Sequence, residues 1–121
     1  MDKNLIKYRV AVATSDGIVV NQHFGKADKF RIYDINQDNT IDFREERKVE
    51  IVCQGGVHDD LRLKENVNYL LDCKYVLVSK IGLGAVNTLE QANIMPMEIP
   101  GIIEESIKKL IVYDEIQALL L

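Results

Sequence analysis

The 121 residues are enough for one hydrophobic core, and their 47% hydrophobic and 28% charged content is that of an ordinary globular domain, not of a disordered or fibrous chain. The net charge of -4, with no block of lysines and arginines, argues against a nucleic-acid partner, which needs a basic stripe to replace counterions on phosphates. No stretch approaches the roughly 18 to 20 apolar residues of a membrane span, and the N-terminus lacks the apolar segment of a secretory signal, so we expect a cytoplasmic protein with no membrane partner.

The first half of the chain is predicted to be mainly β-structure. Runs rich in β-branched and apolar residues predict strands at residues 8–14, 29–35 and 41–49. A strong turn signal, Ser15-Asp16-Gly17, ends the first run, and residues 18–20 briefly resume the extended pattern. Residues 21–28 show no period and are predicted to be a loop. The turn at residues 36–39 predicts that the last two strands form an antiparallel hairpin.

The second half is predicted to alternate between helices and strands. Apolar residues at helical spacing predict helices at residues 59–72, 85–92 and 102–121. Residues 75–79 are continuously apolar, which is typical of a strand buried on both faces, and residues 94–99 form a further strand. In the last helix, the pattern indicates a candidate break near Tyr113 and Asp114.

The predicted order of elements is β-β-β-α-β-α-β-α. A β-meander followed by strand-helix alternation calls for parallel pairing through right-handed crossovers. We therefore predict a single α/β domain over residues 1–121, with one mixed sheet and helices on its faces. Internal repeats, low-complexity tracts and linkers, which would indicate a second domain, are absent from the sequence.

Chemistry-bearing residues gather in loops that lie at strand ends in the predicted fold. Open α/β sheets bind ligands at the carboxyl ends of their parallel strands. The loops that qualify are residues 14–28, 53–58 and 79–84. They hold both histidines, His23 and His58, and one of the two cysteines, Cys53, which is the main residue-level indication of a site.

His23 and His58 are candidate metal ligands, each with a plainer alternative. His23 lies two residues before Gly25, and an imidazole in such a glycine-hinged loop can offer a neutral nitrogen to a transition metal. It could equally be a loop histidine that bonds to backbone or water. His58 is either a ligand or a residue at a helix N-terminus with no chemical role.

The two cysteines are predicted to lie in different environments. Two glycines, Gly55 and Gly56, follow Cys53 closely, and the next helix N-terminus would lower the pKa of its thiol, so the anionic ligand is favoured. A thiolate with imidazoles suits iron or an iron-sulfur species. Cys73 is predicted to be a small buried hydrophobe. Because no C-x-x-C pair occurs, any metal site must be assembled from distant loops and would be open.

Two other hypotheses stay open from the residues alone. Gly82 and Gly84 indicate either a tight strand-to-helix turn or a cradle for an anion, but the full G-x-G-x-x-G dinucleotide motif is absent. A metal-dependent hydrolase would need converging carboxylates. The candidates all have the sequence context of turn or cap residues: Asp16, Asp28, Asp59 and Asp60.

Several segments together resemble the dinitrogenase iron-molybdenum cofactor biosynthesis family, whose members include NifX, the C-terminal part of NifB and the cofactor-binding part of NafY. The resemblance covers roughly residues 8–112. Its most specific parts are the loop at His23-Phe24-Gly25 and the turn from Ile81 to Ala85. The other segments that carry it are residues 10–14, 20–27, 30–33 and 76–86 and the loop around Cys53.

The resemblance implies a ribonuclease H-like fold and a protein that binds iron-sulfur precursors of the nitrogenase cofactor, or the iron-molybdenum cofactor itself. Such a carrier would pass its cargo between metallocluster assembly proteins, as a monomer or weak homodimer. It would not be an enzyme, because the radical-enzyme domain that accompanies this module in NifB is not in the sequence. The alternatives are a regulatory or anion-binding module unrelated to nitrogen fixation and, less favoured, a hydrolase of the same fold.

The resemblance also assigns residues to the expected site. By motif match His23 is the expected cluster-contacting residue, and Cys53 and His58 are further candidate metal ligands. The other cofactor-binding residues that the two motifs imply are Phe24, Gly25, Gly82 and Gly84.

Overall fold

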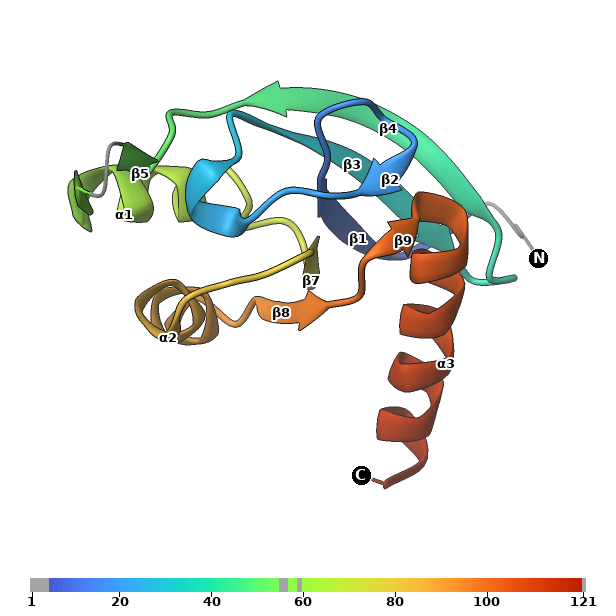
Figure 1. Ribbon diagram of the computed structural model, residues 1–121. Coiled ribbons are helices and arrows are strands. Elements are labelled where there is room, and N and C mark those ends of the chain that lie inside the picture. The colour runs from blue at the N-terminus through green and yellow to red at the C-terminus, as the bar shows by residue number, and fades with distance from the viewer. Residues whose placement is uncertain (1–4, 55–56, 59, 121) are drawn as a thin grey trace.

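A five-stranded mixed sheet forms the centre of the molecule (Figure 1). The computed structural model describes residues 5–54, 57–58 and 60–120, with the backbone alone at residues 53, 54, 57 and 58. The strands are β1 (Ile6–Ala13), β3 (Lys29–Asn36), β4 (Ile41–Lys48), β7 (Tyr75–Val78) and β8 (Met95–Glu98). They lie in the order β4-β3-β1-β7-β8. β3 is antiparallel to both β1 and β4, whereas β7 is parallel to β1 and β8 is parallel to β7.

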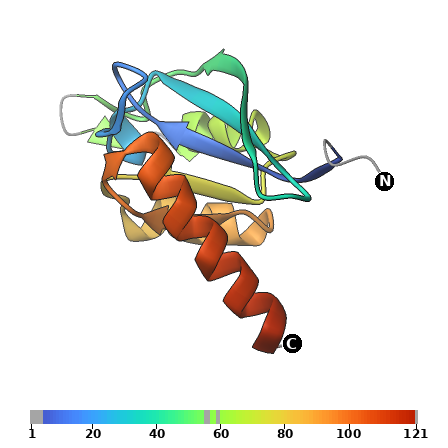
Figure 2. The same cartoon turned by 90° about the vertical axis from the view of Figure 1, so that its right-hand side faces the viewer.

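Helices cover both faces of this sheet. α1 (Asp60–Asn68) and α2 (Leu83–Gln91) pack on one face, and α3 (Ile103–Leu120) packs on the other, as Figure 2 shows from the side. Successive side chains of a strand point to opposite faces, so both faces must be apolar. In β1, Val10 and Val12 face α3, while Ala11 and Ala13 belong to the core under α1 and α2. The prediction of one mixed α/β sheet with helices on its faces is therefore confirmed.

Strand β7, which lies between β1 and β8, is buried along its whole length, as its apolar sequence predicts. Cys73, just before it, is 4% exposed and lies in the core with α1 and α2. Burial raises the pKa of the Cys73 thiol to about 12. Cys73 is thus a small apolar core residue, as the sequence indicates.

Short elements outside the main sheet were only partly predicted. β2 (Val19–Val20) pairs with β9 (Gly101–Ile102), and β5 (Cys53–Gln54) pairs with β6 (Val57–His58). The predicted loop at residues 21–28 contains a short 3-10 helix, η1 (Phe24–Lys26). The order predicted from sequence lacks these elements because two or three residues are too few to show a period.

The first helix ends earlier than predicted. The apolar pattern predicts a helix at residues 59–72, but α1 stops at Asn68. Two tight turns follow, in which the amide of Leu70 donates to the carbonyl of Val67 and that of Cys73 donates to Leu70, each at 2.9 Å. These turns keep Leu70 in the core without continuing the helix, so the spacing of buried residues resembles that of a longer helix.

The candidate break in the last helix is wrong, because α3 runs unbroken from Ile103 to Leu120. Asp114, one of the two residues at the predicted break, is only 7% exposed. The ammonium of Lys74 and the hydroxyl of Tyr75 donate to its carboxylate at 2.7 and 2.5 Å. Burial by itself would raise the pKa of Asp114, but these two hydrogen bonds outweigh it and hold the pKa below its ordinary value.

The charged run at residues 44–48 lies on the exposed edge strand β4. Within it, Arg47 makes a two-pronged ion pair with Asp72, with nitrogen-oxygen distances of 2.7 and 2.8 Å. This pairing lowers the pKa of Asp72 to about 2. The Arg47–Asp72 ion pair connects β4 to the turn after α1.

In the described part of the chain, no helix is long and apolar enough to cross a membrane.

Replacing Asp114 should destabilise the protein in a pH-dependent way. We expect Asp114→Asn to lower the free energy of unfolding by about 1–3 kcal/mol at pH 7, because Lys74 and Tyr75 lose a charged acceptor. The folded-state pKa of this carboxyl is depressed, so its contribution is present above the unfolded-state pKa and is lost as the pH falls below about 4.

Urea unfolding of both proteins at pH 7 and pH 3 measures this effect. The neighbouring exposed Glu115 provides the control, since Glu115→Gln should change stability by no more than about 0.5 kcal/mol. Equal stability of wild type and Asp114→Asn at pH 7 would show that the contact does not hold α3 on the sheet.

The Cys73 thiol should be unreactive in the folded protein. In a Cys53→Ser variant, which leaves Cys73 as the single thiol, we expect Ellman's reagent at pH 8 to label no thiol without denaturant and one thiol in urea. A pKa of about 12 leaves roughly one thiol in 10⁴ ionised at that pH. Rapid labelling of the folded variant would contradict the buried position.

Candidate functional site

The loop after β1 and the turn after β7 lie side by side at the carboxyl ends of these parallel strands. The backbone of His23 forms an isolated parallel bridge with Lys80. The amide of Phe24 donates to the carbonyl of Lys80, and the amide of Ser79 donates to the carbonyl of Gln22, both at 3.0 Å. In Figure 1 the blue segment before β3 runs beside the yellow connection between β7 and α2. Two of the three loops singled out in the sequence therefore meet where open α/β sheets bind ligands.

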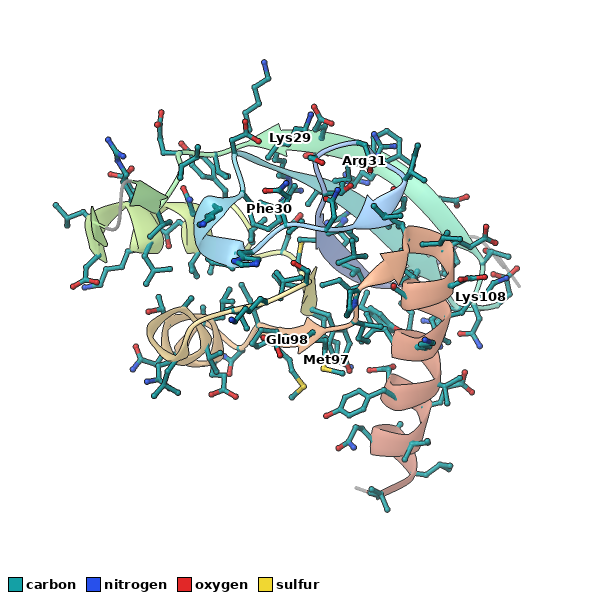
Figure 3. The ribbon with its side chains drawn as sticks, viewed as in Figure 1. Lys29, Phe30, Arg31, Met97, Glu98 and Lys108 are labelled. Atoms are coloured by element: carbon teal, nitrogen blue, oxygen red, sulfur yellow. The ribbon has the colours of Figure 1, made fainter. Side chains whose placement is uncertain are left out.

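Phe24 fixes the His23 loop to the core. Its side chain is 1% exposed, and its ring centroid lies 5.5 Å from that of Phe30. Phe30, which Figure 3 labels beside η1, belongs to the same core as α1 and α2. Ala27 is buried next to them. Phe24, predicted from the family motif to bind a cofactor, thus places its ring in the core and positions the loop that carries His23.

A hollow of about 180 Å³ opens between the two segments. Its walls are formed by His23, Gly25, Lys26, Lys80, Ile81 and Gly82. Paired residues on adjacent strands direct their side chains to the same side, so His23 and Lys80 flank the hollow from neighbouring backbones. The side chain of His23 is exposed, which leaves its imidazole accessible from solvent. The structure therefore brings together three of the predicted residues, His23, Gly25 and Gly82.

The turn that leads into α2 completes one side of the hollow. Gly82 is the N-cap residue of α2, and Gly84 lies in the first turn, outside the lining. A Cβ atom added at either glycine would meet no atom within 4 Å, so this surface is open. The carboxylate of Glu98, at the end of β8, accepts a hydrogen bond from the amide of Ile81 at 2.9 Å and holds the turn in place (Figure 3).

The Cys53 segment lies close to the same region. Cys53 and His58 are register partners in the β5–β6 pair, and β5 packs beside η1. The side chains of both residues lie outside the described part of the structure, so a metal site of His23, Cys53 and His58 remains a prediction. Among the side chains that are described, no group of three histidine, cysteine, aspartate or glutamate residues is arranged to hold a metal ion.

The candidate carboxylates of a hydrolase occupy other positions. Asp16 accepts hydrogen bonds from the amides of Ile18 and Val19 at 2.9 and 3.1 Å, and these bonds lower its pKa. It is a turn residue, as its sequence context indicates. The remaining three are Asp28, which is exposed, Asp60, in the first turn of α1, and Asp59, which lies outside the described residues.

Two lysines of the hollow, Lys26 and Lys80, were not predicted as site residues from the sequence. Lys26 follows the His23-Phe24-Gly25 motif and Lys80 precedes the turn that begins at Ile81, but only the pairing of the two loops shows that both lysines share one surface.

A larger hollow of about 660 Å³ lies elsewhere, between α3 and strands β3 and β4. It includes Tyr33, Phe43 and Ile107 and none of the predicted site residues.

Comparison with known proteins places these features in a family. The family model described as dinitrogenase iron-molybdenum cofactor matches residues 6–113. The FeMo cofactor biosynthesis protein NifB of Frankia alni is 39% identical over 104 residues, which is 84% of this chain and 20% of that protein. NifB of Chlorobaculum tepidum is 32% identical over 109 residues, 88% of this chain and 25% of that protein. The chain thus spans about a fifth to a quarter of the length of these curated relatives.

Two solved structures share the fold. The crystal structure of PH0822 has a TM-score of 0.60 at 28% identity and covers 85% of this chain and 89% of that chain. The NMR structure of TM1290 from Thermotoga has a TM-score of 0.56 at 23% identity, with 85% of this chain and 86% of that chain covered, and supports the fold alone. Because the family model spans nearly the whole sequence and the NifB relatives align over most of it, the chain belongs to the dinitrogenase iron-molybdenum cofactor family.

Proposed function

We propose that this chain binds an iron-sulfur or iron-molybdenum cluster beside His23 and carries it during the assembly of a nitrogenase-type cofactor. The observation that carries the proposal is the hollow between the His23 loop and the turn at residues 80–82. It combines an accessible imidazole with open backbone at the strand ends, where α/β proteins bind ligands. The NifB relatives, named for FeMo cofactor biosynthesis, give the cargo its chemical class.

The chemistry of the hollow suits reversible binding. A neutral imidazole nitrogen is a borderline donor that ligates iron. The open hollow leaves the cluster exposed to a partner, which can then remove it without unfolding the carrier. Firm binding would need further ligands, and we propose Cys53 and His58 for this role because β5 lies beside η1. The cluster is therefore cargo and not a fixed part of the protein.

We propose a carrier and not an enzyme because the described residues of the lining supply one ligand and two cations and include no carboxylate. The partners would be other metallocluster assembly proteins of the cytoplasm, and the protein would act as a monomer or weak homodimer. We also propose a ribonuclease H-like fold, which the mixed five-stranded sheet with helices on both faces supports.

A second candidate function is a regulatory module that binds a small anion. Its support is the N-terminus of α2, where no side chain caps the helix and no acid occurs in the first turn. Such a module would bind phosphate compounds independently of His23, and a thermal shift with phosphate that survives His23→Ala would favour it. The hydrolase alternative gains no supporting observation from the described residues.

Removal of the His23 imidazole should abolish most of the cluster binding. After anaerobic reconstitution with iron and sulfide, we expect wild type to retain a cluster through desalting and His23→Ala to retain it at least about tenfold more weakly, because a metal ligand is lost. Visible absorption and electron paramagnetic resonance of the reduced protein measure the retained cluster.

The neighbouring substitution Gln22→Ala is the matched control, since it alters the same loop and leaves the imidazole in place. It should retain the cluster as wild type does. Negligible uptake by wild type and His23→Ala alike would remove the carrier proposal.

A further inference from the structure

Backbone contacts bring two lysine residues to the hollow beside His23. Lys80 is the bridge partner of His23, and the amide of Lys26 donates to the carbonyl of His23 at 3.1 Å. Both lysines line the hollow. The backbone contacts therefore place both lysines around the same hollow as the imidazole.

Several cations of the chain are paired with aspartates, whereas these two lysines have no such partner among the described residues. Arg9, Arg47 and Lys74 form ion pairs with aspartates at 2.9, 2.7 and 2.7 Å. In the described part of the chain, no carboxylate pairs with Lys26 or Lys80. The acid found at this turn is Glu98, whose carboxylate bonds to the amide of Ile81 and does not line the hollow.

The local charge is opposite to that of the whole protein. The chain carries a net charge of -4, yet the described residues that line the hollow include two lysines and no acid. Lys80 also precedes the N-terminus of α2, where the helix dipole is positive and cations are unfavourable. An anion bound here would be attracted by the helix N-terminus and by both lysines.

We infer that Lys26 and Lys80 make the hollow selective for clusters of net negative charge. This inference rests on the proposed function, and it adds the charge of the cargo. A [4Fe–4S] cluster with four simple thiolates is a dianion. When His23 binds, its nitrogen lone pair forms an iron-nitrogen bond, one iron-thiolate bond breaks, and the thiolate leaves with its electron pair and takes a proton from water. No redox change occurs, and the bound cluster keeps a negative charge that the two ammonium groups attract.

Two probes with the same core and opposite charge test this inference. One is a [4Fe–4S] cluster capped with 2-mercaptoethanol, which is anionic, and the other is the same cluster capped with cysteamine, whose ammonium groups make it cationic at pH 7. We expect wild type to bind the anionic probe about five- to tenfold more tightly in anaerobic titrations at low salt, as two weakly screened charge contacts would give. The preference should shrink as salt is added.

The double variant Lys26→Gln/Lys80→Gln should bring the ratio of the two affinities close to one while His23 still binds the core. The control Lys108→Gln/Lys109→Gln removes the same charge from α3, on the other face of the sheet, and should keep the preference (Figure 3 labels Lys108). Circular dichroism checks that each variant is folded.

The outcomes separate the two proposals. Equal binding of both probes by wild type, or a preference that survives in Lys26→Gln/Lys80→Gln, overturns the inference and leaves the carrier proposal intact. Binding of neither probe by wild type overturns the proposed function and the inference with it.

Discussion

The pairing of the His23 loop with the turn after β7 is the constraint on which the candidate site depends. Hydrogen bonds from the amides of Phe24 and Ser79 extend the parallel sheet by one short step beyond the ends of β1 and β7. The buried ring of Phe24 anchors the loop in the core, and the hydrogen bond from the amide of Ile81 to the carboxylate of Glu98 holds the turn in place. An exposed imidazole on such a support can bind a ligand without first being ordered, which lowers the entropic cost of binding.

If the chain carries a cluster as we propose, support from the core would position the ligand, and exposure to solvent would allow its transfer. The backbone of the hollow is fixed, whereas its lining side chains, the imidazole of His23 and the two lysines, face outward. A ligand held in this way is accessible to a second protein. For the anionic cargo that we propose, the two lysines of the lining would add long-range attraction, which would weaken with salt.

The sequence predicts the sheet and helices well because the main elements show either a period or a continuous apolar run. β7 is an example, since its four consecutive apolar residues are all buried. The failures have local causes. The candidate break in α3 was wrong because Asp114 finds its partners on residues 40 and 39 positions earlier in the chain, which no local pattern reveals.

Local sequence patterns also identified only some of the residues that line the hollow. His23, Gly25 and Gly82 stand out as motif residues, and the structure brings them to one hollow. Phe24 belongs to the same motif, but only packing shows that its ring is a core anchor. Lys26 and Lys80 were missed because an exposed lysine has no distinctive sequence signal until the two loops are known to pair.

The central claim is that His23 itself contacts the cluster, and pulsed electron paramagnetic resonance tests it most directly. The measurement uses protein labelled with ¹⁵N at histidine alone and loaded with a reduced iron-sulfur cluster. We expect a ¹⁵N hyperfine coupling from His23 that is lost from the residual signal of His23→Ala, in which His58 is the one remaining labelled histidine. A bound cluster with no histidine coupling, or a coupling unchanged in His23→Ala, would contradict it.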